Sequence, residues 1–278
     1  MSDIKQKYLS TLDDLEHITG TAMTLSLETQ NREVDSKREQ YCSYIFGKLI
    51  MHAIAVLLVR PNIERQLDKY ESDLWDISSL ATLTRAIVDS YYVFFYLGLD
   101  QASEDELEFR FHLWDYHGEK QRFDMLKKLK SLDPSMGKLE NEVGDLKNKV
   151  IQNTFYQSLD PTKQRKIKKG EIAILYSNSE LSDRLGINSD YYKAIYNDLS
   201  AYIHGYPYAL TQLAVFRSND DESLHVINTT LKVCVGYVSL AVRDFLEIMP
   251  DQDNNVDERA KDLIETWDYV FKNIIEDS

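Results

Sequence analysis

Polar side chains able to do chemistry gather in one stretch of the chain, residues 196–207, with the sequence YNDLSAYIHGYP. Residues three, four and seven apart share one face of an α-helix. The stretch therefore predicts one helical stripe made of a phenol, an amide, a hydroxyl and an imidazole, from Tyr196, Asn197, Ser200 and His204. Gly205 and then Pro207 predict that this helix ends just after His204. The C-terminal end of a helix favours a protonated imidazole, which suits His204 to acid–base work.

A second polar stripe lies in the apolar stretch 73–99, where Arg85 and Asp89 are four residues apart. A charged side chain on a buried helix is costly unless it is paired and hydrogen-bonded. Arg85 and Asp89 therefore either pair with each other to fix the helix register, or meet the first stripe across a helix interface. We expect Ser200 or His204 within hydrogen-bond reach of one of them, directly or through one water.

The elements that must position these stripes are helices. Apolar residues recur at helical spacing along the chain, and no run of strand-like alternation competes with them. The pattern predicts an all-α bundle of about eight to nine helices, in one domain spanning residues 1–278. A basic and lightly packed section at about 133–170 is expected to project from it. The expected helical stretches are 3–30, 35–60, 73–99, 103–132, one between the Asp-Pro pairs at 133–134 and 160–161, 161–188 in part, 189–204, 207–216, 223–249 and one after 257.

Helix starts are predicted from capping residues. Each Asp-Pro pair reads as an N-cap followed by proline in the first helical position. Ser103 opens a capping box, and Ser189 or Asp190 is the expected N-cap of the helix that carries His204.

Composition excludes several classes of protein. Ten glycines and five prolines are too few and too scattered for a Gly-rich phosphate loop or a many-turned β fold. His112 and His117 are five residues apart, and the two cysteines are distant in sequence, so we expect no metal and no cofactor. Residues 1–12 lack the apolar core of a signal peptide, and the apolar runs 45–59 and 86–99 are short for a membrane span. The prediction is a reduced, cytoplasmic chain with no membrane segment.

The charge is unevenly spread along the chain. A net charge of −14 disfavours non-specific binding of nucleic acid by the whole molecule. Residues 120–170, however, hold thirteen Lys and Arg against six acidic residues. A solvated helix face is one interpretation, and an RNA contact is the other. The candidate contacts are Lys163, Arg165, Lys166, Lys168 and Lys169.

Two short motifs carry a resemblance to known proteins: Arg85-x3-Asp89 and Tyr196-x2-Leu199-Ser200-x3-His204. Together they resemble the Arg-x3-Glu/Asp and Tyr-x2-Leu-Ser-x3-His signatures of an uncharacterised bacterial family of all-helical proteins. That family is similar in layout to the HEPN superfamily, many of whose members are metal-independent ribonucleases. The resemblance covers about residues 35–250. It implies a HEPN-like core there and an RNA-directed effector of a toxin or phage-defence system.

The catalytic signature of that superfamily is incomplete in this chain. Active members carry Arg, then four to six residues, then His on one helix. Counting back from His204, these positions hold Leu199, Asp198 and Asn197. The resemblance therefore requires Arg85 to supply the guanidinium from a neighbouring helix.

Under the ribonuclease hypothesis, His204 is the acid or base and Arg85 holds the phosphate. Ser200 and Tyr196 would orient the imidazole, and Asp89 would orient Arg85. A symmetric homodimer could supply a second histidine, and the apolar stretches 73–99 and 223–249 offer it an interface. The alternative is a non-catalytic helical module that binds a protein partner, in which both stripes only hold the core together.

Overall fold

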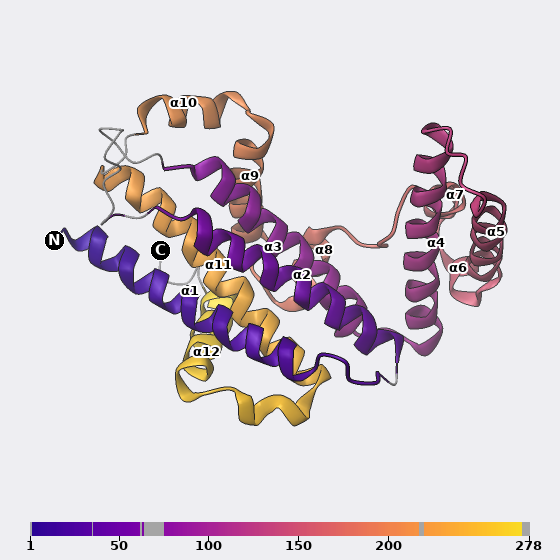
Figure 1. Ribbon diagram of the computed structural model, residues 1–278, viewed down its shortest axis with the longest axis horizontal. Helices are drawn as coiled ribbons and strands as arrows, with labels where there is room; N and C mark the ends of the chain where they lie inside the picture. The colour runs from indigo at the N-terminus through magenta and orange to yellow at the C-terminus, as the bar shows by residue number, and fades with distance from the viewer. Residues whose placement is uncertain (1, 35, 62, 64–74, 217–219, 274–278) are drawn as a thin grey trace. The chain divides into compact units, whose positions relative to one another are not determined.

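The described part of the chain is all-helical, as the sequence predicts, but it has more helices than the eight to nine expected. The structure is a computed structural model that describes residues 2–34, 36–61, 63, 75–216 and 220–273. Within these residues it has twelve α-helices, one 3-10 helix and no strand (Figure 1). Their bounds are α1 Asp3–Glu28, α2 Lys37–Val59, α3 Ile77–Gly98, α4 Glu104–Lys128, α5 Met136–Gln152, α6 Thr154–Ser158, α7 Pro161–Lys169, α8 Asn178–Leu185, α9 Ser189–His204, α10 Pro207–Val215, α11 Asp221–Ile248, η1 Pro250–Asn255 and α12 Glu258–Asn273.

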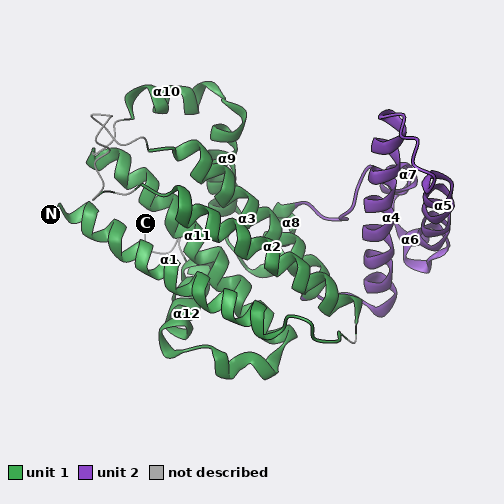
Figure 2. Cartoon of the chain, in the orientation of Figure 1, with its two compact units in different colours: residues 1–98, 178–278 green, residues 99–177 purple. Residues whose placement is uncertain are grey.

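Two compact units divide the chain (Figure 2). Unit 1 is built from residues 1–98 and 178–278, and unit 2 from residues 99–177. Unit 2 is therefore inserted between α3 and α8 of unit 1. The sequence suggested one domain because no glycine-rich or proline-rich linker marks either junction. The basic section predicted at 133–170 falls within unit 2.

The core of unit 1 forms around α3 and α11. Both helices are apolar on most of their circumference, which is the pattern of a central helix. α3 packs against α2, α9 and α11, and α11 also packs against α1 and α12. The rings of Phe46 on α2 and Phe245 on α11 stack with their centroids 4.1 Å apart. Burial of such rings is the main source of stability for this unit.

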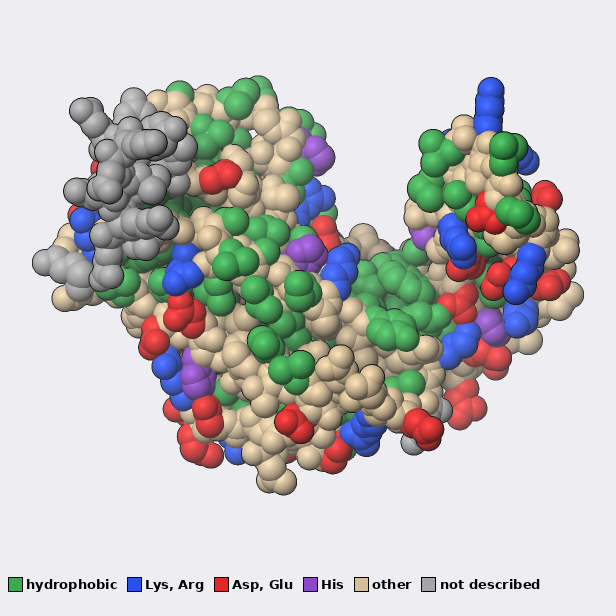
Figure 3. All heavy atoms as spheres, in the orientation of Figure 1, with side chains coloured by type: hydrophobic (Ala, Val, Ile, Leu, Met, Phe, Trp, Pro, Cys, Tyr) green, Lys and Arg blue, Asp and Glu red, His purple; other side chains and the backbone are tan. Residues whose placement is uncertain are grey.

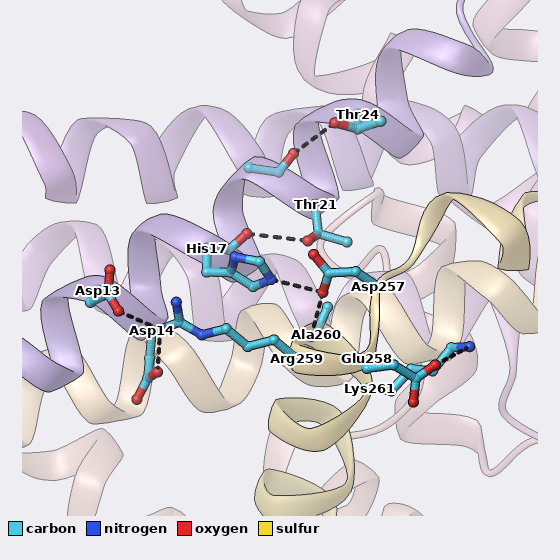
Figure 4. Close-up of polar contacts among 11 residues, drawn as sticks. Asp13, Asp14, His17, Thr21, Thr24, Asp257, Glu258, Arg259, Ala260 and Lys261 are labelled. Atoms are coloured by element: carbon cyan, nitrogen blue, oxygen red, sulfur yellow. Dashed lines mark hydrogen bonds and ion pairs between the residues drawn. The ribbon is translucent and has the colours of Figure 1, made fainter.

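A polar seam joins the N-terminal helix α1 to the C-terminal helix α12 (Figure 4). His17 Nε2 lies 2.9 Å from the Asp257 carboxylate, just before α12. Arg259 Nη2 lies 2.6 Å from Asp13 and 2.9 Å from Asp14. These pairs are largely exposed, so each contributes little free energy. Their effect is to fix where α12 lies along α1.

Unit 2 is a small helical unit made by α4 to α7. Its core gathers buried apolar side chains from each of the four helices, including Phe109, Val150, Tyr156 and Ile167. Beside this core lies a charged residue that the sequence did not single out, Arg110, whose side chain is fully buried.

Arg110 is held by two carboxylates and one ring. Its Nη2 lies 2.8 Å from Asp100 Oδ2 and 2.5 Å from Glu106 Oε1, and its Cζ lies 5.5 Å from the Tyr176 ring centroid. A guanidinium can be buried when its donors are matched in this way. The spacing of Glu106 and Arg110, four residues apart, was the available sequence signal.

Helix starts follow the predicted caps at some positions and not at others. Ser103 and Asp160 cap α4 and α7 as predicted. Asp133 does not start a helix: its carboxylate accepts the Ser135 N–H in a turn, and α5 begins only at Met136. An Asp-Pro pair suits such a turn as well as a helix start. The N-cap of α9 is Asn188 rather than Ser189 or Asp190, because its side-chain oxygen accepts the backbone N–H groups of residues 190 and 191.

Two helices, α2 and α11, are long and apolar enough to cross a membrane on length and composition alone. In α11, 78% of the most apolar stretch is buried inside the structure, as in the core helix of a globular protein. In α2 the buried share is 33%, because one apolar face points outward. The sequence prediction that the chain has no membrane segment and lies in the cytoplasm stays a prediction.

The exposed face of α2 carries large apolar side chains at intervals of seven residues. Tyr44, Met51 and Leu58 are 66%, 65% and 80% exposed. We call these three residues the α2 stripe. On the face of the molecule drawn in Figure 3, hydrophobic side chains gather along the part of unit 1 where α2 and α3 run.

Candidate functional site

The two polar stripes predicted from the sequence meet where α3 packs against α9. Arg85 Nη2 on α3 donates a hydrogen bond of 2.7 Å to the Tyr196 hydroxyl on α9. The Arg85 Cζ atom lies 4.6 Å from the centroid of the Tyr196 ring. The guanidinium is thus both hydrogen-bonded to the phenol and stacked on its ring, which combines a charge-assisted hydrogen bond with a cation–π contact.

Asp89 completes this contact from the next turn of α3. Its Oδ2 lies 3.5 Å from Arg85 Nε, an ionic contact too long for a strong hydrogen bond. Its Oδ1 accepts a hydrogen bond of 3.0 Å from Asn178 Nδ2, at the start of α8. We call Arg85, Asp89, Asn178 and Tyr196 the α3–α9 clasp. It joins segments on both sides of the inserted unit 2.

Opposing effects act on the pKa of Asp89 in the clasp. Burial raises the pKa of Asp89, while Arg85, Asn178 and Tyr196 act to lower it. The raising effect of burial prevails. Burial of the Asp89 carboxylate therefore costs free energy, and its polar neighbours offset part of this cost.

A row of tyrosine rings connects the clasp to the core of unit 1. The Tyr192 ring lies between those of Tyr92 and Tyr196, with centroid distances of 5.1 Å and 5.4 Å. The Tyr92 hydroxyl is 2.5 Å from Ser182 Oγ and 3.3 Å from the Tyr237 hydroxyl. Burial raises the pKa of Tyr92 to about 12, so this phenol stays protonated at neutral pH. These tyrosines pack in and beside the core, and the hydroxyls of Tyr92 and Tyr237 lie within hydrogen-bond distance of each other.

Ser200 and His204 do not take part in the clasp. Ser200 Oγ donates to the backbone oxygen of Tyr196, four residues back on its own helix, at 2.5 Å. His204 is exposed at the end of α9, with its ring centroid 5.3 Å from that of Tyr206. Among the described residues, no hydrogen bond or ion pair joins either side chain to Arg85 or Asp89. The expected link through Ser200 or His204 is replaced by Tyr196.

The physical reason is the rise of the helix. Successive residues of an α-helix advance by about 1.5 Å, so His204 lies about 12 Å along α9 from Tyr196. Tyr196 occupies the turn at which α9 crosses α3. Gly205, with a φ of 60°, ends the helix beyond His204 as the sequence predicts.

The candidate nucleic-acid contacts all lie on α7 of unit 2. This helix buries Ile167 and exposes most of its other side chains. The Nζ atom of the half-buried Lys163 lies 5.6 Å from the Tyr176 ring centroid. The exposed cations of the helix are Arg165, Lys166, Lys168 and Lys169.

Other reactive groups give no candidate centre. In the described ranges of the chain, no three His, Cys, Asp or Glu side chains are grouped so that they could hold a metal ion. Cys42 and Cys234 are buried free thiols, and burial raises the pKa of each to about 12. Such thiols are poor nucleophiles at neutral pH.

One feature of unit 1 was missed by the sequence analysis: a pocket between α9, α10 and α11. Asp198, Tyr202 and Tyr208 are among the residues that line it. The spacing of Asp198 and Tyr202 puts both on one face of α9, but sequence gives no sign of which helices close the space opposite them.

Comparison with known proteins identifies a family but no function. The chain belongs to a family of unknown function, DUF5677, whose model matches residues 71–223. The matched region contains unit 2, every residue of the α3–α9 clasp, and both Ser200 and His204. No curated protein and no solved structure matches the chain.

Proposed function

From the geometry of unit 1, we propose that this chain is a non-catalytic helical module that acts by binding another protein chain. The proposal rests on the contacts that the side chains of the α3–α9 clasp make with one another. Arg85 is engaged by Tyr196, and Asp89 by Asn178. A phosphate-binding arginine presents its donors to a substrate, whereas this guanidinium lies on the Tyr196 ring, donates one hydrogen bond to its hydroxyl and is in ionic contact with Asp89.

The distance to the histidine supports the same conclusion. Metal-independent cleavage of RNA needs a base, a cation and an acid around a single phosphate. Arg85 is bound at the turn of Tyr196, while His204 lies about 12 Å further along the helix. This separation along α9 disfavours contact of one phosphate with both side chains of the same chain.

The surface of α2 supports a binding role. The α2 stripe repeats every seven residues, a spacing that keeps apolar side chains facing a partner where two helices pair. A two-fold axis through Met51 would place Tyr44 opposite Leu58 in an antiparallel pair, so the stripe is complementary to itself. We therefore take a second copy of this chain as its partner. Most side chains of α3 and α11, the stretches first expected to form the dimer interface, are buried in unit 1, which favours the α2 stripe as the interface.

The role of the clasp is tested by removing His204 and Arg85 in turn. We expect His204→Ala to change the free energy of unfolding by less than about 0.5 kcal/mol, because its side chain is exposed. Arg85→Ala should destabilise unit 1 clearly, because it removes the cation beside the Asp89 carboxylate and the donor to the Tyr196 hydroxyl. Neither the unmutated protein nor the variants should cleave RNA without added metal. RNA fragments with 2′,3′-cyclic phosphate ends that disappear in His204→Ala would overturn the proposal.

The dimer is tested by placing a charge in the centre of the α2 stripe. Light scattering at micromolar concentration should give twice the chain mass for the unmutated protein and the chain mass for Met51→Lys. The matched control is Met23→Lys, at an exposed methionine of α1 in the same unit. A monomer in the unmutated protein, or dissociation by both variants, would refute this interface.

A HEPN-like, metal-independent ribonuclease of a toxin or phage-defence system remains the second candidate. Two observations favour it: the exposed imidazole of His204 at a helix end, and the exposed cations of α7. In a homodimer, two copies of His204 could act on one RNA, and the cations of α7 offer a separate contact for a polyanion. The RNA cleavage assay above decides between the candidates.

A further inference from the structure

The pocket of unit 1 has the size and lining of a small-molecule site. It has a volume of about 330 Å³ and lies between α9, α10 and α11. Apolar side chains such as Leu199 and Val233 form part of its wall. Pockets of this volume with a few polar groups in an apolar lining are typical ligand sites. None of its lining residues belongs to the α3–α9 clasp or the α2 stripe.

The polar part of the lining includes three tyrosines and one carboxylate. Tyr191, Tyr202 and Tyr208 border the pocket, and Asp198 is the acidic residue among its lining side chains. Burial raises the pKa of Tyr202 to about 12, and the proximity of Asp198 and Tyr208 adds to this rise. Tyr202 is thus close enough to interact with both Asp198 and Tyr208.

Asp198 has no balancing charge in the described part of the chain. Its side chain is half-buried, and the structure gives it no hydrogen bond or ion pair with any described residue. Burial alone raises its pKa. The lining contains no lysine or arginine, and its His225 is exposed to solvent and carries no bond to Asp198. A half-buried carboxylate without a partner favours a bound cation.

We propose that this pocket binds a small organic cation, an amine or quaternary ammonium group attached to a compact apolar body. The faces of tyrosine rings attract such cations, and Asp198 neutralises the charge. The apolar wall accepts the body of the ligand. An anion would be repelled by Asp198, and the net charge of −14 concentrates cations rather than anions near the surface. The proposal goes beyond the proposed function and stands independently of the α3–α9 clasp.

The test compares a cation with its neutral isostere. The full chain is titrated by calorimetry at pH 8, where histidine side chains are mostly neutral. The probes are choline, benzyltrimethylammonium, and 3,3-dimethylbutan-1-ol, in which carbon replaces the nitrogen of choline. We expect saturable binding of at least one cation, and binding of the alcohol at least about tenfold weaker than that of choline or undetectable. Two results would overturn the proposal. One is that neither cation binds at 10 mM, about the weakest affinity of interest here. The other is that choline and the alcohol bind with equal affinity.

Variants then locate the bound cation. Asp198→Asn keeps the shape of the side chain and should weaken binding at least about tenfold, and Tyr208→Leu should weaken it as well. The matched control is Asp190→Asn, which removes the same charge from an exposed position of α9 outside the pocket. Circular dichroism verifies that each variant is folded. Unchanged binding by a folded Asp198→Asn, or an equal loss in Asp190→Asn, would refute the assignment of the site.

Discussion

Removing the hydroxyl of Tyr196 is the most direct test of the α3–α9 clasp. Tyr196→Phe deletes the oxygen that accepts from Arg85 at 2.7 Å but keeps the ring against the guanidinium. A hydrogen bond to a charged group contributes about 1.5–3 kcal/mol. The Arg85 side chain is 20% exposed, so water replaces part of the lost bond. We therefore expect Tyr196→Phe to lower the free energy of unfolding by about 1–2 kcal/mol.

A double-mutant cycle separates this contact from other effects of the substitution. Arg85→Met removes the guanidinium and keeps an apolar stem of similar length. If the phenol acts mainly through Arg85, Tyr196→Phe should cost much less in the Arg85→Met background. We expect a coupling energy of about 1 kcal/mol, within the range measured for directly contacting residues.

The measurement must report on unit 1 alone, because the two units can unfold in separate transitions. The chain has three tryptophans, of which Trp114 lies in unit 2 while Trp75 and Trp267 lie in unit 1. Urea unfolding followed by fluorescence in a Trp114→Phe background therefore monitors unit 1. The control is Tyr269→Phe, which removes a hydroxyl from a side chain that is 62% exposed. A coupling energy below about 0.3 kcal/mol, the usual error of additivity, would refute the argument.

Three further substitutions test the packing and the buried charges. Gly236→Ala should destabilise unit 1 by about 1–3 kcal/mol in calorimetry, because a Cβ atom would lie 2.7 Å from Phe271; unchanged stability would show that α12 moves freely. Burial raises the pKa of Asp244 from 3.8 to about 6, so the folded chain binds a proton that the unfolded chain does not between these pH values. The free energy of unfolding should therefore rise as pH falls from 7 to 4. The rise should be on the order of 3 kcal/mol larger in the unmutated protein than in Asp244→Asn. Urea midpoints that change with pH in the same way in both proteins would contradict this. Arg110→Met leaves two carboxylates without their cation. It should lower the free energy of unfolding of unit 2 by about 3–5 kcal/mol, measured through the Trp114 fluorescence. A smaller loss would mean that water reaches the carboxylates.

The sequence predicts the helices well because helical periodicity and capping are local. The apolar circumference of α3 indicated a central helix, and α3 lies at the core of unit 1. Helix ends depend on residues within one turn, so they can be predicted without knowing the fold. Examples are the N-caps Ser103 and Asp160 and the helix end at Gly205. The meeting of the Arg85 and Tyr196 stripes was also foreseeable, since each was polar on a helix that buries its neighbours.

The sequence fails where the answer depends on which turn of one helix crosses another. Tyr196, Ser200 and His204 share a polar stripe, but only tertiary packing decides that Tyr196 reaches Arg85. The pocket was unpredictable for a related reason. Tyr191 and Asp198 come from α9 and Val226 from α11, and periodicity does not say that these helices lie side by side. The burial of Arg110 could not be predicted, because a charged residue on a helix rich in charged residues is normally exposed.

The insertion of unit 2 sets the order in which the chain can fold during synthesis. Residues 99–177 are contiguous, so their contacts are local and can form as soon as they leave the ribosome. Unit 1 cannot be completed then: Arg85 must wait for Tyr196, 111 residues later, and α3 must wait for α11. At about 5–20 residues per second, this wait lasts on the order of 10 s. During it, the apolar faces that α2 and α3 later bury in unit 1 stay uncovered, and such surface favours chaperone binding and misassembly.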